Sequence, residues 1–318
     1  MRARTAVVAI VVSAAWLIIA VSQGRAQGPG NAGKPAAVVN GEPISLAELD
    51  AAVKIMSGPS AVQVPETRRR QMRMEALAML MDNLLLQQFL HQNGPRIDPG
   101  EINKYIGELE GALKKENKKL SDYLTENAMT DAQLRAQVTT ALQWREYTKN
   151  RITDADVQQY YNENKDFFDG VQVRASHILL RVPLNGTDAD VQAAKSKLQA
   201  IRQDIEAGKI TFADAAKKYS QCPSAPEGGD IGYFPRKFFV DEEFAKAAFN
   251  PQLHIGDLIG LVRTEFGVHL IKLTDRKAGQ ASDFNKIKDD VREVCLTELR
   301  MNIVAHQRKQ ARIEVNVQ

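Results

Sequence analysis

The chain contains 318 residues, enough for two or three modest domains that each bury an ordinary hydrophobic core. Its 42 lysine and arginine residues nearly balance its 39 aspartate and glutamate residues. This balance argues against a nucleic-acid-binding protein, which would be expected to carry a basic face or arm.

Residues 1–26 differ in composition from the rest of the chain. Arg2 and Arg4 precede an uncharged, mostly apolar run at residues 5–21, and small residues follow it. This order is typical of a secretory signal peptide. Because the run is long, an uncleaved membrane anchor is the alternative. In either case an exported protein is expected, either periplasmic or held at the extracytoplasmic face of the membrane. A linker containing Gly and Pro follows at residues 27–35.

The next residues predict a short strand and a turn, followed by a helix. Asn40-Gly41 is a hairpin-type turn signal. Ser45, with Glu48 three residues later, is a capping box that begins a helix.

Residues 66–93 predict the longest helix, because apolar residues recur there at helical spacing up to a Gly94-Pro95 stop. Four of its residues are methionines, which suit either a core or an adaptable apolar groove: Met72, Met74, Met79 and Met81. Further helices are expected to begin near residues 99, 121, 131 and 154. The module from 45 to 168 is therefore nearly all helix.

From residue 171 the hydrophobic period changes. Strands are predicted at 173–181 and 267–273, and helices at 188–206, 212–219 and 241–249. With a further strand after the Gly-rich loop, this order predicts an α+β domain with a small, mostly antiparallel sheet.

A last helix is predicted at residues 282–312, and a short strand-like segment follows it. Its apolar stripe has no partner in the preceding domain, so the helix is expected to pack against the first helical module. The predicted divisions are a signal peptide or anchor (1–26), a linker (27–35), a helical module (36–169), an α+β domain (170–277) and a C-terminal helix (278–318).

Three short motifs stand in order in the α+β domain. They are V-R-A-S-H-I-L-L-R at 173–181, Y-S-Q-C-P-S-A-P-E-G-G-D-I-G-Y-F at 219–234 and G-D-L-I-G-L-V-R-T-E-F-G-V-H-L-I-K-L at 256–273. The outer two each carry one histidine, and the middle one carries a cysteine in a Gly-rich loop. Together they resemble the parvulin family of peptidyl-prolyl cis-trans isomerases.

The flanking segments carry a second, softer resemblance. The opening A-A-V-V-N-G-E-P-I-S and the stretch R-R-R-Q-M-R-M-E-A-L-A-M-L-M-D-N-L-L-L are similar to the SurA/PrsA group of exported chaperone-isomerases. That resemblance implies an N-terminal helical module completed by the C-terminal helix, with the parvulin domain inserted between.

The parvulin resemblance implies the site residues. It assigns the polar floor of the site to His177, Cys222 and His269. It assigns the proline socket to Ile231 and Phe244, together with an aromatic residue. A one-residue insertion leaves open whether Phe238 or Phe239 is that aromatic residue. Thr264 and Ser176 are expected to supply supporting hydroxyls, and Gly228, Gly229 and Gly232 to permit turns with positive φ.

The expected reaction needs neither metal nor cofactor. Rotation about an X-Pro bond crosses a barrier of roughly 18–20 kcal/mol because twisting destroys amide resonance, but no bond breaks. A site can lower this barrier by holding the proline ring, drying the amide and stabilising the twisted form.

Cys222 has other interpretations. As a covalent nucleophile it would indicate a thiol hydrolase, but the surrounding C-P-S-A-P lacks known protease signatures. A zinc site with His177 and His269 would lack the close-spaced ligand pairs of structural zinc motifs. A disulfide with Cys295 is less favoured than two free thiols.

The sequence thus predicts an exported parvulin-type isomerase with chaperone activity on unfolded or nascent exported polypeptides that contain X-Pro bonds. The alternative is a holdase whose parvulin domain only binds clients. No nucleic-acid partner is expected, and membrane association is expected only through the N-terminal segment. The loop that begins at Arg181 contains this one arginine and then Asp188 and Asp190, so selectivity for phosphorylated Ser/Thr-Pro is not expected.

Overall fold

The structure, a computed structural model, describes residues 34–57, 65–127, 129–149, 151–182 and 186–317. The chain divides into two compact units. The helical unit comprises residues 1–154 and 293–318, and the sheet unit comprises residues 155–292. The predicted signal peptide or anchor lies outside the described residues. Among those described, no helix is long and apolar enough to cross a membrane.

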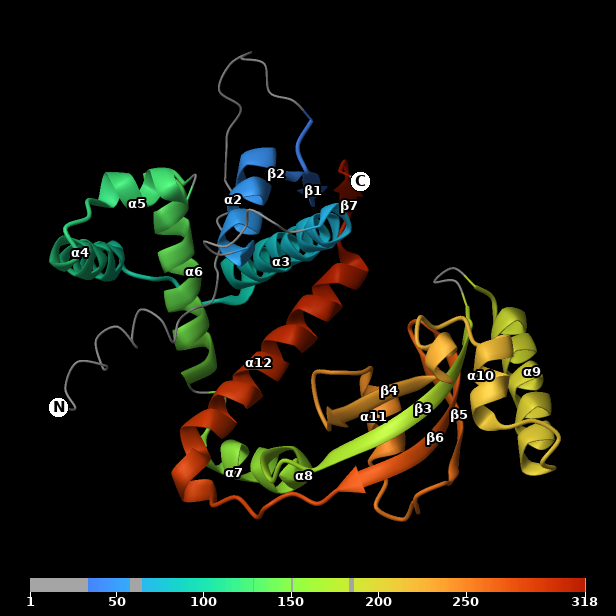
Figure 1. The fold of residues 1–318 in the computed structure, drawn as a ribbon. Coiled ribbons are helices and arrows are strands. Elements are labelled where there is room, and N and C mark those ends of the chain that lie inside the picture. Colours follow the sequence, from blue (N-terminus) through green and yellow to red (C-terminus); the bar gives the residue numbers. More distant parts are fainter. Residues whose placement is uncertain (1–33, 58–64, 128, 150, 183–185, 318) are drawn as a thin grey trace. The chain divides into compact units, whose positions relative to one another are not determined.

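Among the described residues, the helical unit combines five helices and a small sheet with the later part of α12 (Figure 1). Its elements are β1 (Ala37–Val39), β2 (Glu42–Ile44), α2 (Leu46–Ser57), α3 (Glu66–Asn93), α4 (Pro99–Lys115), α5 (Leu120–Glu126), α6 (Asp131–Lys149), α12 (Phe284–Gln310) and β7 (Ile313–Val315). The three strands form an antiparallel sheet in the order β2-β1-β7. Asn40 (φ 51°) and Gly41 (φ 88°) make the predicted hairpin turn, in which both central residues need positive φ.

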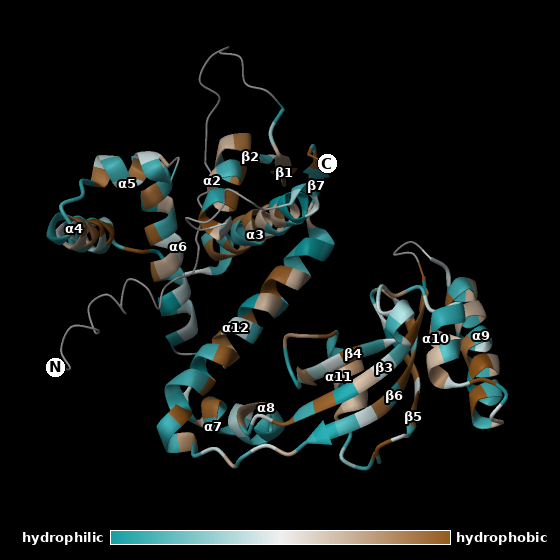
Figure 2. Cartoon of the chain, viewed as in Figure 1, coloured by the Kyte–Doolittle hydropathy of each residue, from teal (hydrophilic) through white to brown (hydrophobic). Residues whose placement is uncertain are grey.

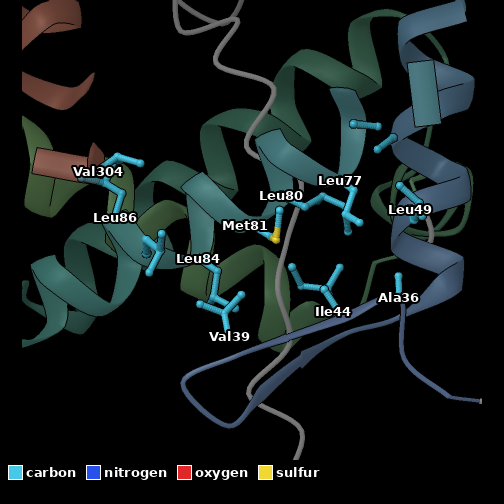
Figure 3. Packing of buried hydrophobic residues seen from close by; sticks show 14 of the residues in the cluster. Ala36, Val39, Ile44, Leu49, Leu77, Leu80, Met81, Leu84, Leu86 and Val304 are labelled. Carbon is cyan, nitrogen blue, oxygen red and sulfur yellow. The ribbon is translucent and has the colours of Figure 1, made fainter. Parts of the chain in front are cut away.

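The core of this unit forms around α3, whose hydrophobic and hydrophilic segments alternate along the helix (Figure 2). Leu77, Leu80 and Leu84 of α3 are fully buried and pack with the small sheet and α2 (Figure 3). Met72 and Met81 are also buried, whereas Met74 is 45% exposed. The methionines of α3 therefore serve partly as core residues.

Two helix N-termini in this unit are joined through their caps. Ser45 and Glu48 form the predicted capping box at α2, and Thr130 and Gln133 form a matching pair at α6. The Gln133 amide also donates a 3.0 Å hydrogen bond to Oε1 of Glu48. Both side chains are buried, so this contact fixes α6 to α2.

The later part of α12 packs on α3, as predicted. Arg300 donates to the side chain of Asn83, Arg308 pairs with Asp82, and Val304 joins the core. β7 then pairs with β1. The beginning of α12 differs from the prediction, because Phe284 belongs to the sheet unit and contacts Tyr161 at 5.3 Å between ring centroids.

The sheet unit holds one four-stranded antiparallel sheet in the order β4-β3-β6-β5. Its elements are α7 (Asp154–Glu163), α8 (Lys165–Phe168), β3 (Gln172–Arg181), α9 (Asp188–Glu206), α10 (Phe212–Tyr219), the short 3-10 helix η2 (Ala225–Glu227), β4 (Asp230–Pro235), α11 (Glu242–Ala248), β5 (Leu258–Thr264) and β6 (Gly267–Lys277). α9 and α10 match their predicted ranges. Residues 155–168, expected in the helical module, group with the sheet.

One strand was not predicted separately. β5 and β6 form a hairpin in which Thr264 pairs with Gly267 across a two-residue turn. At Gly267 (φ 149°), a Cβ atom would lie 2.1 Å from the carbonyl oxygen of Leu180. The third motif therefore contains two strands, and Gly267 stands where their hairpin comes close to the backbone of β3.

The two faces of this sheet are covered by different helices (Figure 1). Ile178 and Leu270 pack with α9 and α10 on one face, whereas Ala175 and Ile271 pack with α11 on the other. This follows from the period of two along a strand. The odd-numbered residues of β3, which include the histidine of the first motif, therefore point toward α11.

Candidate active site

The two motif histidines lie on neighbouring strands and on the same face. In the β3–β6 register His177 pairs with Ile271, and His269 pairs with Leu179, so the histidines are diagonal neighbours. Their Nδ1 atoms lie 3.0 Å apart, and the rings stack at 5.2 Å with an interplanar angle of 23°. One ring therefore donates an N–H to the other.

Thr264 extends this hydrogen-bond chain from β5. Its Oγ1 lies 2.7 Å from Nε2 of His269 and also accepts a hydrogen bond from the backbone N–H of Phe266. Thr264 is buried, as are both histidines. The hydroxyl thus fixes the orientation of the His269 ring.

Burial keeps both imidazoles neutral at pH 7. Desolvation lowers the pKa of His177 to about 4. Desolvation, with smaller effects of His177 and Arg263, lowers the pKa of His269 to about 3. Each ring then carries one N–H, so the choice of tautomer at one histidine dictates the tautomer at the other.

The chain of hydrogen bonds ends at an unpaired atom. Nε2 of His177 is buried and has no hydrogen-bond partner among the described residues. If Thr264 donates to His269, this atom carries a proton; if Thr264 accepts, it carries a lone pair. In either state its hydrogen-bonding capacity is unused among the described residues.

Aromatic rings form the apolar side of the site. Phe244 of α11 meets both histidines edge-on, with centroids 5.5 Å from each. Behind it, the fully buried Phe234 lies 6.0 Å from Phe244. Ile231 is partly buried against the same cluster. The neutral histidines therefore border a hydrophobic surface.

The adjacent phenylalanines of the β4–α11 loop point to different neighbours. Phe239 stacks on Phe234 at 5.9 Å with an interplanar angle of 11°. Phe238 has φ 67° and contacts Phe167 of α8 instead. A left-handed conformation costs a non-glycine residue about 1–2 kcal/mol. Of the two candidates, Phe239 is thus the one next to the aromatic cluster.

The Gly-rich loop with Cys222 lies beside the part of β3 that follows its pairing with β4. Ser220 Oγ accepts from the backbone N–H groups of Leu179 and Cys222, and the Gly229 carbonyl accepts from His177. At Gly229 (φ 82°) a Cβ would lie 2.3 Å from the carbonyl oxygen of His177. The predicted positive φ angles of Gly228, Gly229 and Gly232 are confirmed.

The side chain of Cys222 is less closely integrated than expected. It is half-buried, and within the described residues no hydrogen bond joins it to either histidine. Neither Cys222 nor Cys295 is in a disulfide, which confirms the two free thiols. Ser176 is buried, but within the part of the chain that the structure describes no hydrogen bond joins its side chain to either histidine. In the described ranges, no group of three or more His, Cys, Asp or Glu side chains is arranged to hold a metal ion.

Sequence reasoning missed two residues of this region. Phe234 bridges Phe239 and Phe244, and Ser220 fixes the cysteine loop to β3. Both residues lie within the second motif, so their membership of that motif was the sequence signal that could have identified them.

Two segments of the chain are similar to known protein families. Residues 177–275 match the PPIC-type PPIase domain family, and residues 1–148 match the SurA-like N-terminal domain family. The chain therefore combines a PPIC-type PPIase domain with a SurA-like N-terminal domain. Both the parvulin and the SurA/PrsA resemblances are thereby confirmed.

Several curated relatives carry the name foldase protein PrsA. The protein of Bacillus subtilis is 34% identical over 149 residues, which cover 46% of this chain and 44% of that protein. The protein of Clostridium botulinum is 26% identical over 283 residues, which cover 81% of this chain and 79% of that protein. A solved PrsA structure from Bacillus anthracis aligns with a TM-score of 0.45 and 22% identity over 73% of this chain and 96% of that chain.

Proposed function

We propose that this parvulin-type isomerase catalyses X-Pro rotation at the His177–His269 pair, with Thr264 as its support and Phe244 and Phe239 beside the proline ring. The observation that carries the proposal is a neutral, buried histidine pair that faces an aromatic surface. Ile231 completes the apolar socket, and Cys222 lines the polar side at the rim of the site.

The proposed mechanism is non-covalent. A planar amide is stabilised by charge separation, which water solvates well, so a dry and uncharged site favours the twisted amide over the planar one. His177 and His269 suit this task because burial holds their pKa values far below neutral pH. They supply hydrogen bonds without bringing a charge that would need water.

The free Nε2 of His177 supplies the polar contact. In one tautomer it donates to the lone pair that grows on the proline nitrogen or to the preceding carbonyl. Thr264 and His269 select that tautomer by the direction of their own hydrogen bond. No proton is transferred to or from the substrate, so neither metal nor cofactor enters the scheme.

The proposed substrates are unfolded or partly folded exported polypeptides. The relatives are named foldase proteins, and the apolar N-terminal run at residues 5–21 supports export. We place the protein outside the cytoplasm, either periplasmic or held at the membrane by that segment.

Client binding in the helical unit is supported by an incompletely covered apolar cluster on α4, α5 and α6. Four of its residues are buried, and eight more are only partly buried. These eight are Ile97, Ile102, Tyr105, Leu109, Leu120, Tyr123, Leu124 and Met129. The same cluster favours the second candidate function, a holdase with a weak isomerase domain.

The test is cis-to-trans isomerisation of an X-Pro tetrapeptide by the full chain against a His177→Ala/His269→Ala variant. Acceleration by the wild type that is lost in the variant supports the proposed site. Circular dichroism and urea unfolding must show that the variant is folded. If the folded wild type gives no acceleration but suppresses client aggregation, the holdase is the correct function.

A further inference from the structure

The β4–α11 loop has an unusual backbone conformation at Phe238, the residue before Phe239. Phe238 adopts φ 67°, a left-handed conformation that a side chain with a Cβ rarely takes. Such conformations persist only where surrounding contacts hold them, and they concentrate at functional sites. The loop therefore needs an anchor.

Contacts made by Phe238 and by the residue before it supply that anchor. Its ring meets Phe167 edge-on, with centroids 5.8 Å apart and an interplanar angle of 86°. The preceding residue, Lys237, is 6% exposed, and its ammonium lies 5.4 Å from the centre of the Tyr160 ring. The loop is thus held against α7 and α8 by two aromatic contacts.

A charged pair closes the loop from its other end. Arg236 forms two hydrogen bonds with the carboxylate of Glu242, at 2.8 and 2.9 Å. Asp241 caps α11 by accepting from the backbone of Glu243. Because Arg236 and Glu242 flank Phe238 and Phe239, both ends of the turn are fixed, and in its middle the ring of Phe238 is held by Phe167.

α8 is itself rigidly held within the sheet unit. Phe168 contacts Tyr161 at 5.7 Å, and the Tyr161 hydroxyl donates to the backbone carbonyl of Ser282. Asp169, directly after α8, accepts from both the backbone and the hydroxyl of Ser282. Phe167 therefore stands on a fixed support, which a residue must have if it is to orient another.

We propose that Phe167 is a positioning residue of the isomerase: through Phe238 it holds the β4–α11 loop so that Phe239 stacks beside the proline site. The inference rests on the proposed function, which puts Phe239 at that site. Phe167 lies before residue 177, where the isomerase family match begins, so the functional domain extends into α8.

The test compares KM and kcat for an X-Pro peptide between the full-length wild type and Phe167→Ala. Because the histidine pair is untouched, KM is expected to rise while kcat stays within twofold. The rise is expected to be about 2- to 10-fold, the range that an edge-to-face ring pair is worth. Phe167→Tyr, which keeps the ring, should restore KM.

Two variants of Phe238 show whether the ring contact is the cause. Phe238→Ala should raise KM as Phe167→Ala does, and the double variant should be no worse than either alone. Phe238→Gly adopts the same backbone angle without strain but lacks the ring, so it should raise KM equally. A wild-type KM in Phe238→Gly would overturn the proposal.

Controls separate this inference from the proposed function and from loss of stability. Ile205→Ala removes a partly buried side chain from the opposite face of the sheet and should leave KM unchanged. If Phe167→Ala does not fold, Phe167→Leu replaces it, with a KM between those of the wild type and Phe238→Ala. An active wild type with unchanged KM in the folded Phe167 variant refutes the positioning role alone, whereas an inactive wild type refutes the proposed function.

Discussion

Replacing Thr264 by valine tests the hydrogen-bond chain at the centre of the site. Valine has nearly the same shape as threonine, but a methyl group replaces the hydroxyl. The change removes the 2.7 Å contact with Nε2 of His269 and the acceptor for the Phe266 N–H. Water can reach the half-exposed Phe266, but not the buried ring of His269. The main loss is therefore one unpaired ring nitrogen.

The expected cost follows from that unpaired atom. A buried polar group without its partner costs about 1–3 kcal/mol, and no cavity term is added because the volume is nearly unchanged. Urea unfolding of Thr264→Val at pH 7 should show this decrease in the free energy of unfolding. If the same free energy is lost from the transition state, kcat/KM falls about 5- to 150-fold.

Thr264→Ser is the matched control because it keeps the hydroxyl and loses only a methyl group. It should retain most of the activity and the wild-type imidazole tautomers, which nitrogen NMR of the histidine rings reports. In Thr264→Val the tautomers should become mixed. A valine variant as active as wild type, with unchanged ring signals, would refute the role of Thr264 in orienting His269.

Three further outcomes are expected. The pKa values of His177 and His269 are about 4 and about 3 in the folded state, below the 6.5 of free imidazole, so the unfolded chain takes up protons first as the pH falls. The free energy of unfolding should therefore decline below pH 6.5 by up to about 1.4 kcal/mol per pH unit for each histidine. Over the range from pH 8 to 5.5, kcat/KM of the folded enzyme should stay constant. An activity that titrates near pH 6.5 would contradict the buried, neutral pair. Glu48→Ala removes a cap and strands the Gln133 amide, so chemical unfolding should show a loss of about 2–4 kcal/mol, whereas a change below 0.5 kcal/mol would mean that the cap link contributes little. Gly229→Ala forces a Cβ against the His177 carbonyl and should abolish activity together with native near-UV circular dichroism; a native, active variant would disprove that close approach.

Local signals predicted most of the helices. The Ser45–Glu48 capping box and the apolar spacing of residues 66–93 both act within a few turns of helix, so the observed bounds of α3 equal the predicted ones. The Asn40-Gly41 turn was likewise predicted, because few residue pairs adopt two positive φ angles in succession. These features depend on neighbours in sequence.

Contacts between distant residues were predicted less well. The Glu48–Gln133 bond joins residues 85 positions apart, and nothing in either local sequence indicates the other partner. The split of α12 between the two units has the same cause. Its apolar stripe is continuous, but Phe284 packs with Tyr161, whereas Val304 packs in the core around α3. Periodicity shows which face of a helix is buried, but not what covers it.

The assignment of Phe238 and Phe239 shows most clearly where local reasoning ends. In an extended loop the two rings would point in opposite directions. The insertion before Phe244 shifts the alignment of this segment with the motif, so the sequence allowed either residue in the socket. The left-handed turn at Phe238 accompanies a contact of its own ring with Phe167, whereas the ring of Phe239 stacks on Phe234. A phenylalanine has no intrinsic preference for that turn, and the contact that stabilises it comes from a helix outside the three motifs. The sequence of the isomerase domain alone therefore does not determine which phenylalanine stacks on Phe234.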